Sequence, residues 1–439
     1  MSGRLNVFQR MMLRWSDLHP YSGVHVVQID QPLVEARLAE RIARQLEANG
    51  LTGLVVDPSR RWFCYEGGPS QVALEVLSGS LDPFAVVCDA VERQLNAPFP
   101  HARQANPFRF FAVAGADSFH LGLAYDHFIA GGESIALLLK GIVDALSAPD
   151  LTRPGPTALD LYPATYRQLI VRHPVAFLKG LLGLPGLLAL SSRSFRPRYR
   201  GGDDPQNGLA YFRLGPVQLA ALRRASKAWG VTINDFFLAS LLQALSPLAA
   251  DRRQERRRRE LAVASIVNAR DDFGADPRST FGQFLASFRI AHPVPEGISL
   301  RELVHDVHAE TTRIKRHKLY LQTIVALGLS SLMWRFLSVP RRRRFFAKHH
   351  PAWGGVTALN VDALWGMRGP DGLQSPDYLR AVSTGPLCPM VLAVTTARDA
   401  LNVGVTFRTA EFSRADVDAV IARFKRCIES LEEGEACAA

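Results

Sequence analysis

The sequence predicts a mixed α/β protein, of the α+β sandwich type, that is built of two lobes. Along the chain, short runs with the alternation of strands are separated by segments with the spacing of amphipathic helices. The 439 residues exceed what a single hydrophobic core usually serves. A stretch rich in proline, glycine and arginine divides the chain. We therefore place a linker at 199–208, between an N-terminal lobe at 1–198 and a C-terminal lobe at 209–439.

The N-terminal lobe is predicted to alternate strands with helices. The first helix carries its charges on one face and ends in Asn49-Gly50, and Asp82-Pro83 suits the start of the second helix. Two apolar runs on either side of the turn at 114–117 predict a hairpin. The expected helices cover 33–51 and 82–95, and the expected strands cover 23–29, 53–56, 62–65, 108–114 and 118–125.

The C-terminal lobe is predicted to open with a strand and two helices, the second of which is capped by Thr232. Further strands, an amphipathic helix, a hairpin and a final helix follow along the chain. The expected strands cover 210–214, 261–267, 286–290, 381–395 and 401–406, and the expected helices cover 215–230, 233–248, 300–316 and 412–431.

The composition limits the kinds of partner and location. The 52 Lys and Arg against 41 Asp and Glu give a net charge of +11, which favours anionic partners. No zinc finger, recognition helix or basic face interleaved with aromatic residues accompanies the charge, so we expect no nucleic-acid partner. The five cysteines are scattered and lack a CxxC pair, so neither a metal site nor a disulfide framework is expected. This cysteine usage suits a reducing environment, so we expect a cytoplasmic location. Residues 1–16 have no continuous apolar core, so we expect no signal peptide.

Two segments, 174–190 and 320–339, are unusually apolar. Lys179 and Pro185 interrupt the first and Arg335 interrupts the second, so each is short for a membrane span. Two interpretations are open: helices buried in the core, or peripheral docking at the inner face of a membrane. Docking is favoured by the basic residues beside both segments. These residues are Arg193, Arg196, Arg198, Arg200 and the run from Arg341 to Arg344.

The stretch from Tyr125 to Ser134 (YDHFIAGGES) carries the strongest functional signal. An apolar run leads into it and an apolar helical pattern follows, so His127 sits where a strand ends and a glycine-rich turn begins. Strand ends are places where a rigid scaffold presents side chains to a cleft. A neutral imidazole suits the removal of a proton from an alcohol, an amine or a thiol near pH 7.

This stretch resembles the active-site motif His-His-x-x-x-Asp-Gly of the chloramphenicol-acetyltransferase-like superfamily. That superfamily includes condensation domains of peptide synthetases, plant-type hydroxycinnamoyl transferases and wax ester synthases. The positions that correspond to the two His, the Asp, the Gly and a Ser that often follows are Asp126, His127, Gly131, Gly132 and Ser134. The resemblance implies two acetyltransferase-like lobes in pseudo-tandem, an active-site tunnel between them, and His127 as the general base.

Weaker matches in the C-terminal lobe extend the resemblance over about residues 20–430. These matches lie at 227–236, 267–270 and 281–284, in the order of the family. The segment 357–366 resembles in part the Asp-Phe-Gly-Trp-Gly motif of plant-type members and is expected to form a loop near the tunnel. Within it, Thr357 and Asn360 are candidate donors to the oxyanion of the reaction.

Arg270 takes the place of the family Arg that pairs with the motif Asp, which Gly131 replaces here. A buried guanidinium stays charged and needs another carboxylate. Candidates for that carboxylate are Asp126, Glu133 and Asp271. The alternative is an Arg270 that is exposed to solvent.

An arginine run between a predicted helix and a predicted strand has two open interpretations. It is either a solvated loop or an electrostatic landing site for CoA phosphates or an acidic carrier protein. The residues are Arg252, Arg253, Arg256, Arg257, Arg258 and Arg259.

These features predict an acyltransferase that passes an acyl group from a CoA or carrier-protein thioester to a hydroxyl or an amine. No bound cofactor is expected, because the thioester is a co-substrate. The apolar segments and their arginines point to a lipidic acyl chain or a lipid-like acceptor. The alternative is a catalytically inactive relative that binds or scaffolds, since the motif has lost its first His and its Asp. A third interpretation is a basic membrane-surface protein without acyl chemistry.

Overall fold

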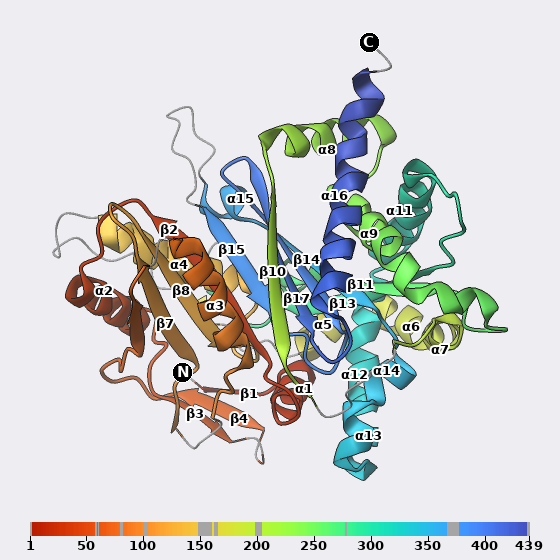
Figure 1. Ribbon diagram of the computed structural model, residues 1–439. Coiled ribbons are helices and arrows are strands. Elements are labelled where there is room, and N and C mark those ends of the chain that lie inside the picture. The colour runs from red at the N-terminus through yellow and green to blue at the C-terminus, as the bar shows by residue number, and fades with distance from the viewer. Residues whose placement is uncertain are drawn as a thin grey trace.

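The computed structural model shows two lobes side by side, with the first half of the chain in one and most of the second half in the other (Figure 1). It describes residues 2–57, 59, 61–79, 82–100, 104–147, 160–161, 166–197, 204–276, 279–366 and 377–436. Each lobe is built on one mixed sheet, which agrees with the predicted fold class. The predicted linker lies partly outside these residues, and its bounds stay a prediction.

The N-terminal lobe is a five-stranded sheet with helices on both faces. Its elements are β2 (Ser22–Ile29), α2 (Glu35–Ala48), β5 (Leu74–Leu77), α3 (Pro83–Asn96), β7 (Phe108–Ala114), β8 (Phe119–Asp126), α4 (Gly132–Ser147) and β15 (Tyr378–Val382). The strand order is β15-β2-β8-β7-β5. Because strand residues alternate between faces, Phe110 and Leu121 share a core with α4, whereas Phe111 and Val113 share another with α3.

A smaller four-stranded sheet and helix α1 complete this lobe. The bounds are β1 Ser2–Arg4, α1 Val7–Ser16, β3 Leu54–Asp57, β4 Trp62–Tyr65 and β6 Gln104–Ala105. The sequence pattern did not predict α1, although Asn6 and Gln9 form a capping box at its start. Helix α1 buries Met11, Met12 and Trp15, and the indole of Trp15 meets the Phe346 ring edge-on at 5.6 Å.

The C-terminal lobe is a six-stranded sheet in the order β10-β17-β16-β14-β11-β13. The strands are β10 Asn207–Leu214, β11 Leu261–Asn268, β13 Leu285–His292, β14 Gly354–Asn360, β16 Met390–Ala397 and β17 Ala400–Arg408. The helices that form its core are α8 Pro216–Trp229, α9 Ile233–Leu245, α11 Leu300–Arg316 and α16 Arg414–Ala436. Thr232 caps α9 as predicted, accepting a hydrogen bond from the Asp235 amide.

Strand β15 corrects one prediction, the single strand expected at 381–395. The structure has two strands there in different sheets, because β15 ends at Val382 and β16 begins at Met390. The break falls at Gly385, whose φ of 55° suits glycine, and at the two prolines that follow it. Strand β15 pairs with β2 of the N-terminal lobe, whereas β16 and β17 form a hairpin.

Short elements join the two lobes and surround the C-terminal sheet. They are β9 Asp160–Leu161, α5 Tyr166–Arg172, α6 Pro174–Leu182, α7 Leu184–Arg193, η1 Ser246–Gln254, α10 Arg270–Phe273, β12 Thr280–Phe281, η2 Leu319–Leu321, α12 Gln322–Met333, η3 Trp334–Phe336, α13 Val339–Arg343, α14 Phe345–His349 and α15 Val361–Trp365. Strand β12 pairs with β9 in parallel, which ties the C-terminal half to the N-terminal half a second time.

Membrane-spanning length is rare among the described helices. One stretch, 233–254, is long and apolar enough to span a bilayer, but 67% of it is buried in the C-terminal core. Helices α6 and α7 reach that length only as a pair, and the pair is bent by 46°. The first apolar segment therefore forms two short helices, not one span.

Candidate active site

A cavity of about 970 Å³ is lined by residues of both lobes. The N-terminal sheet contributes the turn after β8 and strand β15, and the C-terminal lobe contributes β11, β13 and β14, with α6, α7, α11 and α12 around them. Residues that line it include Tyr21, Tyr125, His127, Gly132, Leu182, Leu187, Ser287, Arg289, Glu310, Ala326, Thr357, Arg380 and Cys388. His127 is thus the predicted base in a large, mostly apolar space.

His127 follows β8 directly and is held in a defined orientation. Its ring is stacked on Tyr21 at 5.3 Å with an angle of 18°, and it meets Tyr125 edge-on at 5.6 Å. Its amide donates to the carbonyl of Tyr21 at 3.3 Å. Its Nδ1 lies 3.2 Å from the carbonyl oxygen of Ala130. Since a carbonyl only accepts, Nδ1 carries the proton of the neutral ring and Nε2 keeps a lone pair.

Burial also keeps this imidazole neutral. Desolvation lowers the pKa of His127 below its ordinary value, and the positive charge of Arg380 lowers that pKa further. The carbonyl of Ala130 and the charge of Asp126 raise the pKa, each by less than desolvation lowers it but by more than Arg380 does. The ring is therefore a free base near pH 7.

Residues just after β12 hold the turn that carries His127 through hydrogen bonds. Gln283 donates through Nε2 to the carbonyls of His127 at 2.6 Å and Ala130 at 3.3 Å. The amide of Gly131 donates to the carbonyl of Gly282 at 3.0 Å, and the amide of Gly282 donates to the hydroxyl of Ser134 at 3.1 Å. The 281–284 match drew attention to this segment, but not to Gln283 as the residue that fixes the turn.

Arg270 is buried, with 2% of its surface exposed, so the alternative of an exposed Arg270 is wrong. Its Nη1 lies 2.5 Å from the carboxylate of Glu133, one of the three predicted candidates. Its Nη2 donates to the hydroxyl of Ser134 and, at 3.0 Å, to the carbonyl of Thr280. By the resemblance, an Asp at position 131 would pair with Arg270. Here Glu133, two positions later, makes that ion pair.

Gly131 and Asp126 have local roles at this turn. A Cβ at Gly131 would lie 3.4 Å from Gln283 Oε1 and 3.5 Å from Leu285, which is close to ordinary contact. Asp126 is buried, and its Oδ1 accepts a hydrogen bond from the amide of Phe128 at 3.5 Å, so it contacts the backbone of the turn.

Thr357 and Asn360 are separated by the structure. Thr357 lines the cavity, and its carbonyl accepts a hydrogen bond from Arg380 at 2.9 Å. Asn360 is exposed, and its side chain caps α15 by accepting from the amide of Ala363 at 3.0 Å. Asn360 is therefore a helix cap, and it is not among the residues that line the cavity.

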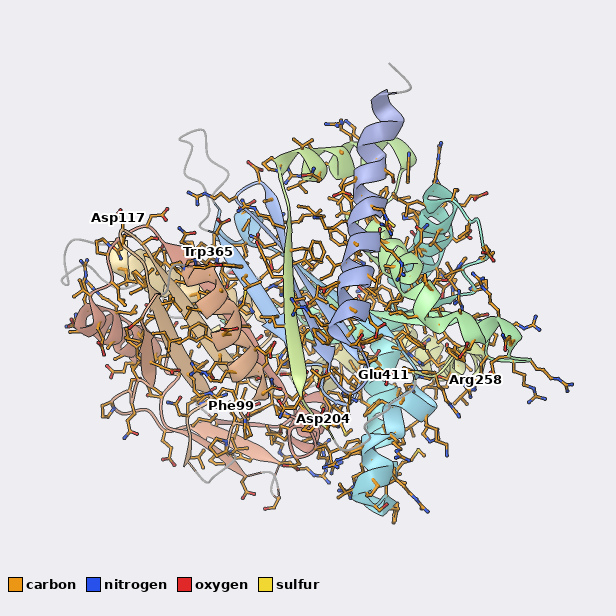
Figure 2. All side chains as sticks on the ribbon, in the orientation of Figure 1. Phe99, Asp117, Asp204, Arg258, Trp365 and Glu411 are labelled. Carbon is orange, nitrogen blue, oxygen red and sulfur yellow. The ribbon has the colours of Figure 1, made fainter. Side chains whose placement is uncertain are left out.

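The arginine run contains buried and exposed members, which corrects its treatment as one surface. Arg252 is fully buried and donates to carbonyls of Ser246, Ala249, Pro293 and Val294. Arg258, labelled at the outer edge of the C-terminal lobe in Figure 2, is half-buried and donates to the carbonyls of Ser191 and Ser194. The remaining arginines of the run are exposed, and these are Arg253, Arg256, Arg257 and Arg259.

Metal-binding clusters are not found in the part of the chain that the structure describes, where no group of three or more His, Cys, Asp or Glu could hold a metal ion. Sequence reasoning missed Tyr21 and Arg380, which line the cavity, and Gln283, which holds the His127 turn. Tyr21 and Arg380 lie in segments with no motif, so only the fold brings them to His127.

Comparisons with known proteins find the fold in solved structures. No protein-family model matches the chain, and no curated protein matches it. The first condensation domain of the calcium-dependent antibiotic synthetase, in complex with substrate analogue 2a, is 18% identical with a TM-score of 0.71, over 98% of this chain and 97% of that chain. The condensation domain of the Monacolin K polyketide synthase MokA is 13% identical with a TM-score of 0.67, over 98% and 96%.

A third structure is the starter condensation domain of rhizomide synthetase RzmA, a mutant in complex with C8-CoA and Leu-SNAC. It is 16% identical with a TM-score of 0.66, over 98% of this chain and 93% of that chain. At such identities the likeness shows the fold. The chain therefore has the two-lobed condensation-domain fold that the sequence resemblance implied.

Proposed function

We propose that the protein transfers an acyl group from a thioester to a hydroxyl or an amine, with His127 as the general base. One observation carries this proposal: the bond from Nδ1 of His127 to the Ala130 carbonyl leaves the Nε2 lone pair for the cavity. A neutral, oriented imidazole at the wall of a large cavity is what acyl transfer without a covalent enzyme intermediate requires.

In the proposed reaction, Nε2 of His127 takes the proton of the acceptor hydroxyl or amine as its oxygen or nitrogen attacks the thioester carbonyl. The tetrahedral intermediate collapses, its carbon–sulfur bond breaks, and the thiolate leaves. The imidazolium returns the proton to the thiolate sulfur. Because burial lowers the pKa of His127, the ring gives up that proton readily.

The proposed donor is an acyl-CoA or an acylated carrier protein. The net charge of +11 and the exposed Arg253, Arg256, Arg257 and Arg259 support an anionic donor. The rhizomide neighbour was solved with C8-CoA and Leu-SNAC, and by analogy we propose a thioester of similar size. The apolar lining of α6, α7 and α12 supports a lipidic acyl chain or acceptor.

The experiment compares wild type with His127→Ala on a panel of acyl-CoA and acyl-carrier thioesters and candidate acceptors. Released thiol and acylated product are both measured. We expect turnover by the wild type and a loss of about a hundredfold or more in the variant. His120→Ala is the matched control, because His120 lies on β8, which leads into His127, but packs against Phe84 and is outside the cavity. Equal activity of wild type and His127→Ala, or none in either, would falsify the proposal.

The second candidate is an inactive binding or scaffolding protein. The loss of the first His and of the Asp from the motif favours it. The open cavity of about 970 Å³ at His127 argues against it, because a relative that only scaffolds has no need of an open space at the former catalytic residue. Absence of turnover with the whole panel, together with unimpaired thioester binding, would favour this candidate.

A membrane contact at the inner face is a further part of the proposal, supported by an apolar helical face on α5–α7, α12, η3 and α13. Its exposed residues are Val171, Val175, Leu178, Leu181, Leu182, Leu188, Leu329, Leu332, Met333, Phe336 and Val339. Figure 1 shows α6, α7, α12 and α13 along the same side of the C-terminal lobe. A group of arginines lies beside this face: Arg10, Arg14, Arg61, Arg335 and Arg342. Desolvation lowers the pKa of Arg10 and of Arg14, and repulsion from the neighbouring arginines lowers both pKa values further.

Apolar side chains beside a cluster of cations suit an anionic leaflet. Vesicle co-sedimentation tests this, with phosphatidylcholine alone and with added phosphatidylglycerol. We expect binding that needs the anionic lipid, weakens with salt and is reduced in Phe336→Ser. Val217→Ser is the control, because Val217 is also an exposed apolar residue but lies on α8, outside this face. Binding that ignores lipid charge and salt would contradict the contact.

A further inference from the structure

Arg380 is a buried cation at the place where the two lobes meet. It lies in the middle of β15, opposite His25 of β2, and only 3% of its surface is exposed. Desolvation lowers the pKa of Arg380 to about 10, so the guanidinium stays charged at pH 7. Such a charge is costly to bury unless an anion compensates it.

The protein supplies Arg380 with neutral partners only. Its Nε donates to the hydroxyl of Thr395 at 2.9 Å, and its Nη2 donates to the carbonyls of Thr357 at 2.9 Å and Val394 at 3.0 Å. In the described part of the chain, no carboxylate lies within 4.0 Å of the guanidinium. Glu133, an acid whose charge reaches it, is paired with Arg270.

The remaining nitrogen, Nη1, is aimed at the cavity beside His127. It makes no hydrogen bond to any residue that the structure describes, although the other two nitrogens are fully used. A Cβ on Gly132 would lie only 3.0 Å from it, so a residue without a side chain is what lets the guanidinium reach the turn. Arg380, Gly132 and His127 all line the cavity.

We propose that Nη1 of Arg380 binds a carboxylate of the acyl acceptor, which makes the acceptor an α-amino or α-hydroxy acid. This inference rests on the proposed acyl transfer, because the nucleophile one carbon from the carboxylate would be the group that His127 deprotonates. The partners that β14 and β16 give Arg380 are neutral, and a bound carboxylate would supply the missing negative charge. It would also form a strong, charge-assisted hydrogen bond. Neutral acceptors, such as fatty alcohols, leave the cation uncompensated.

The test measures product binding, which needs no turnover. The probes are N-octanoylglycine and its uncharged analogue N-octanoylglycinamide, titrated calorimetrically into the full chain at pH 7. We expect the wild type to bind the acid about tenfold or more tightly than the amide. Arg380→Met should bind the acid and the amide equally. Arg380→Lys should keep part of the preference for the acid, because an ammonium keeps the charge but lacks the forked donors of a guanidinium.

Gly132→Ala tests the geometry while Arg380 is retained. The added methyl group crowds Nη1 and should reduce the preference for the acid. The matched variant Gly131→Ala adds the same methyl group one residue earlier, where it meets only Gln283 and Leu285 at 3.4 Å or more, and should keep the preference. If Arg380→Met fails to fold, as judged by its circular dichroism melt, this pair decides the matter.

The outcomes separate this inference from the proposed function. Equal binding of acid and amide by the wild type would overturn the carboxylate site whatever the turnover. Loss of turnover in Arg380→Met without any wild-type preference for the acid would assign the guanidinium to the reacting carbonyl oxygen, and would also overturn it. A preference for the acid that persists in His127→Ala, with turnover lost, supports both. The same preference with turnover unchanged in His127→Ala supports the site and refutes the proposed base.

Discussion

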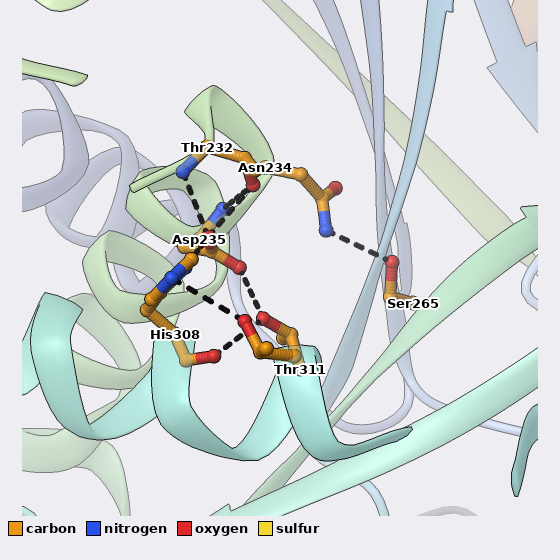
Figure 3. Close-up of polar contacts among 7 residues, drawn as sticks. Thr232, Asn234, Asp235, Ser265, His308 and Thr311 are labelled. Atoms are coloured by element: carbon orange, nitrogen blue, oxygen red, sulfur yellow. Dashed lines mark hydrogen bonds and ion pairs between the residues drawn. The ribbon is translucent and has the colours of Figure 1, made fainter. Parts of the chain in front are cut away.

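Two buried polar clusters in this protein differ in whether they are closed. Asp235, fully buried at the start of α9, accepts from the hydroxyl of Thr311 at 2.7 Å and from the amide of Thr232 at 2.9 Å, and its Oδ2 lies 2.8 Å from Nδ1 of His308 (Figure 3). Its partners come from the capping box of α9 and from α11. The cluster at the cavity wall, with His127 and Arg380, has unused nitrogens at the same depth.

This difference indicates that the Asp235 cluster stabilises the fold, whereas the cluster with His127 and Arg380 is open to a ligand. Burial alone would raise the pKa of Asp235, but hydrogen bonds from His308, Thr311 and Thr232 lower it overall, so the protein itself pairs this charge. Arg380 has no carboxylate within 4.0 Å among the described residues, and Nε2 of His127 has no donor among them. Two basic side chains with unused nitrogens on the wall of one cavity point to a ligand there.

Breaking the closed cluster should have the largest effect on stability. Asp235→Ala leaves His308, Thr311 and Thr232 without their acceptor and should lower the free energy of unfolding by about 3 kcal/mol. Urea denaturation measures this. Because the folded pKa of Asp235 is lowered below 3.8, its contribution in the wild type is present above pH 3.8 and is lost as the pH falls through the folded value. Asp418→Ala, at an exposed ion pair, is the control, and a loss no greater than the control's would contradict the comparison.

Glu133→Gln breaks the ion pair beside the turn that carries His127. Arg270 keeps Ser134 and the Thr280 carbonyl but loses its carboxylate, so we expect a loss of about 2 kcal/mol. The expected loss is below that of a fully buried pair because the Glu133 side chain is 28% exposed. Asp144→Asn, on the same helix and in an exposed pair with Lys140, should change stability by less than about 0.5 kcal/mol. Identical effects of the two variants would show that Arg270 does not depend on Glu133.

The open cluster should show itself in the pH dependence of activity. The pKa of His127 is lowered by burial, so the acid limb of kcat/KM should lie below pH 6.5, with activity falling as the pH drops and Nε2 takes a proton. The rate should fall about tenfold per pH unit below that limb. His120→Ala should leave the limb in place. A limb at or above pH 6.5 would rule out His127 as the titrating base.

Gly131→Asp, which restores the family residue, should have the smallest effect. The Cβ fits, but the carboxylate would approach Gln283 Oε1, a buried acceptor that has no donor in the structure. Since Arg270 already has Glu133, we expect a change in stability within about 1 kcal/mol and a folded protein. A thermal melt measures this, and loss of folding would count against the correspondence of Gly131 with the motif Asp.

Local sequence signals predicted the elements well where one signal dominated. Thr232 and the capping box define the start of α9, and Asp82-Pro83 defines the start of α3. Strand β8 and the turn with His127 were predicted by an apolar run that ends at glycines. The partner of Arg270 was narrowed to three carboxylates by charge alone, and the structure selects Glu133 because helix α4 begins at that turn.

Non-local features could not be predicted in this way. Nothing in the segment around Arg380 shows which sheet its strand joins, because the strands of both sheets are rich in apolar residues. Arg252 looks like a member of a solvated arginine run, yet a turn of 3₁₀ helix buries it against backbone carbonyls. Asn360 was assigned to the tunnel by analogy, although an Asn before a short helix is as readily a cap.

The pairing of β15 with β2 has a consequence for how the protein is made. His25 and Tyr378, which touch across this pairing, are 353 residues apart in the chain. During synthesis the edge of β2 stays without its neighbour until nearly the whole polypeptide has emerged, which is a hazard for association with other chains. Arg380, which lines the same cavity as His127, arrives with the same strand. A nascent or truncated chain would thus have the histidine but lack Arg380, so ligand selectivity would appear only once the last sheet edge closes.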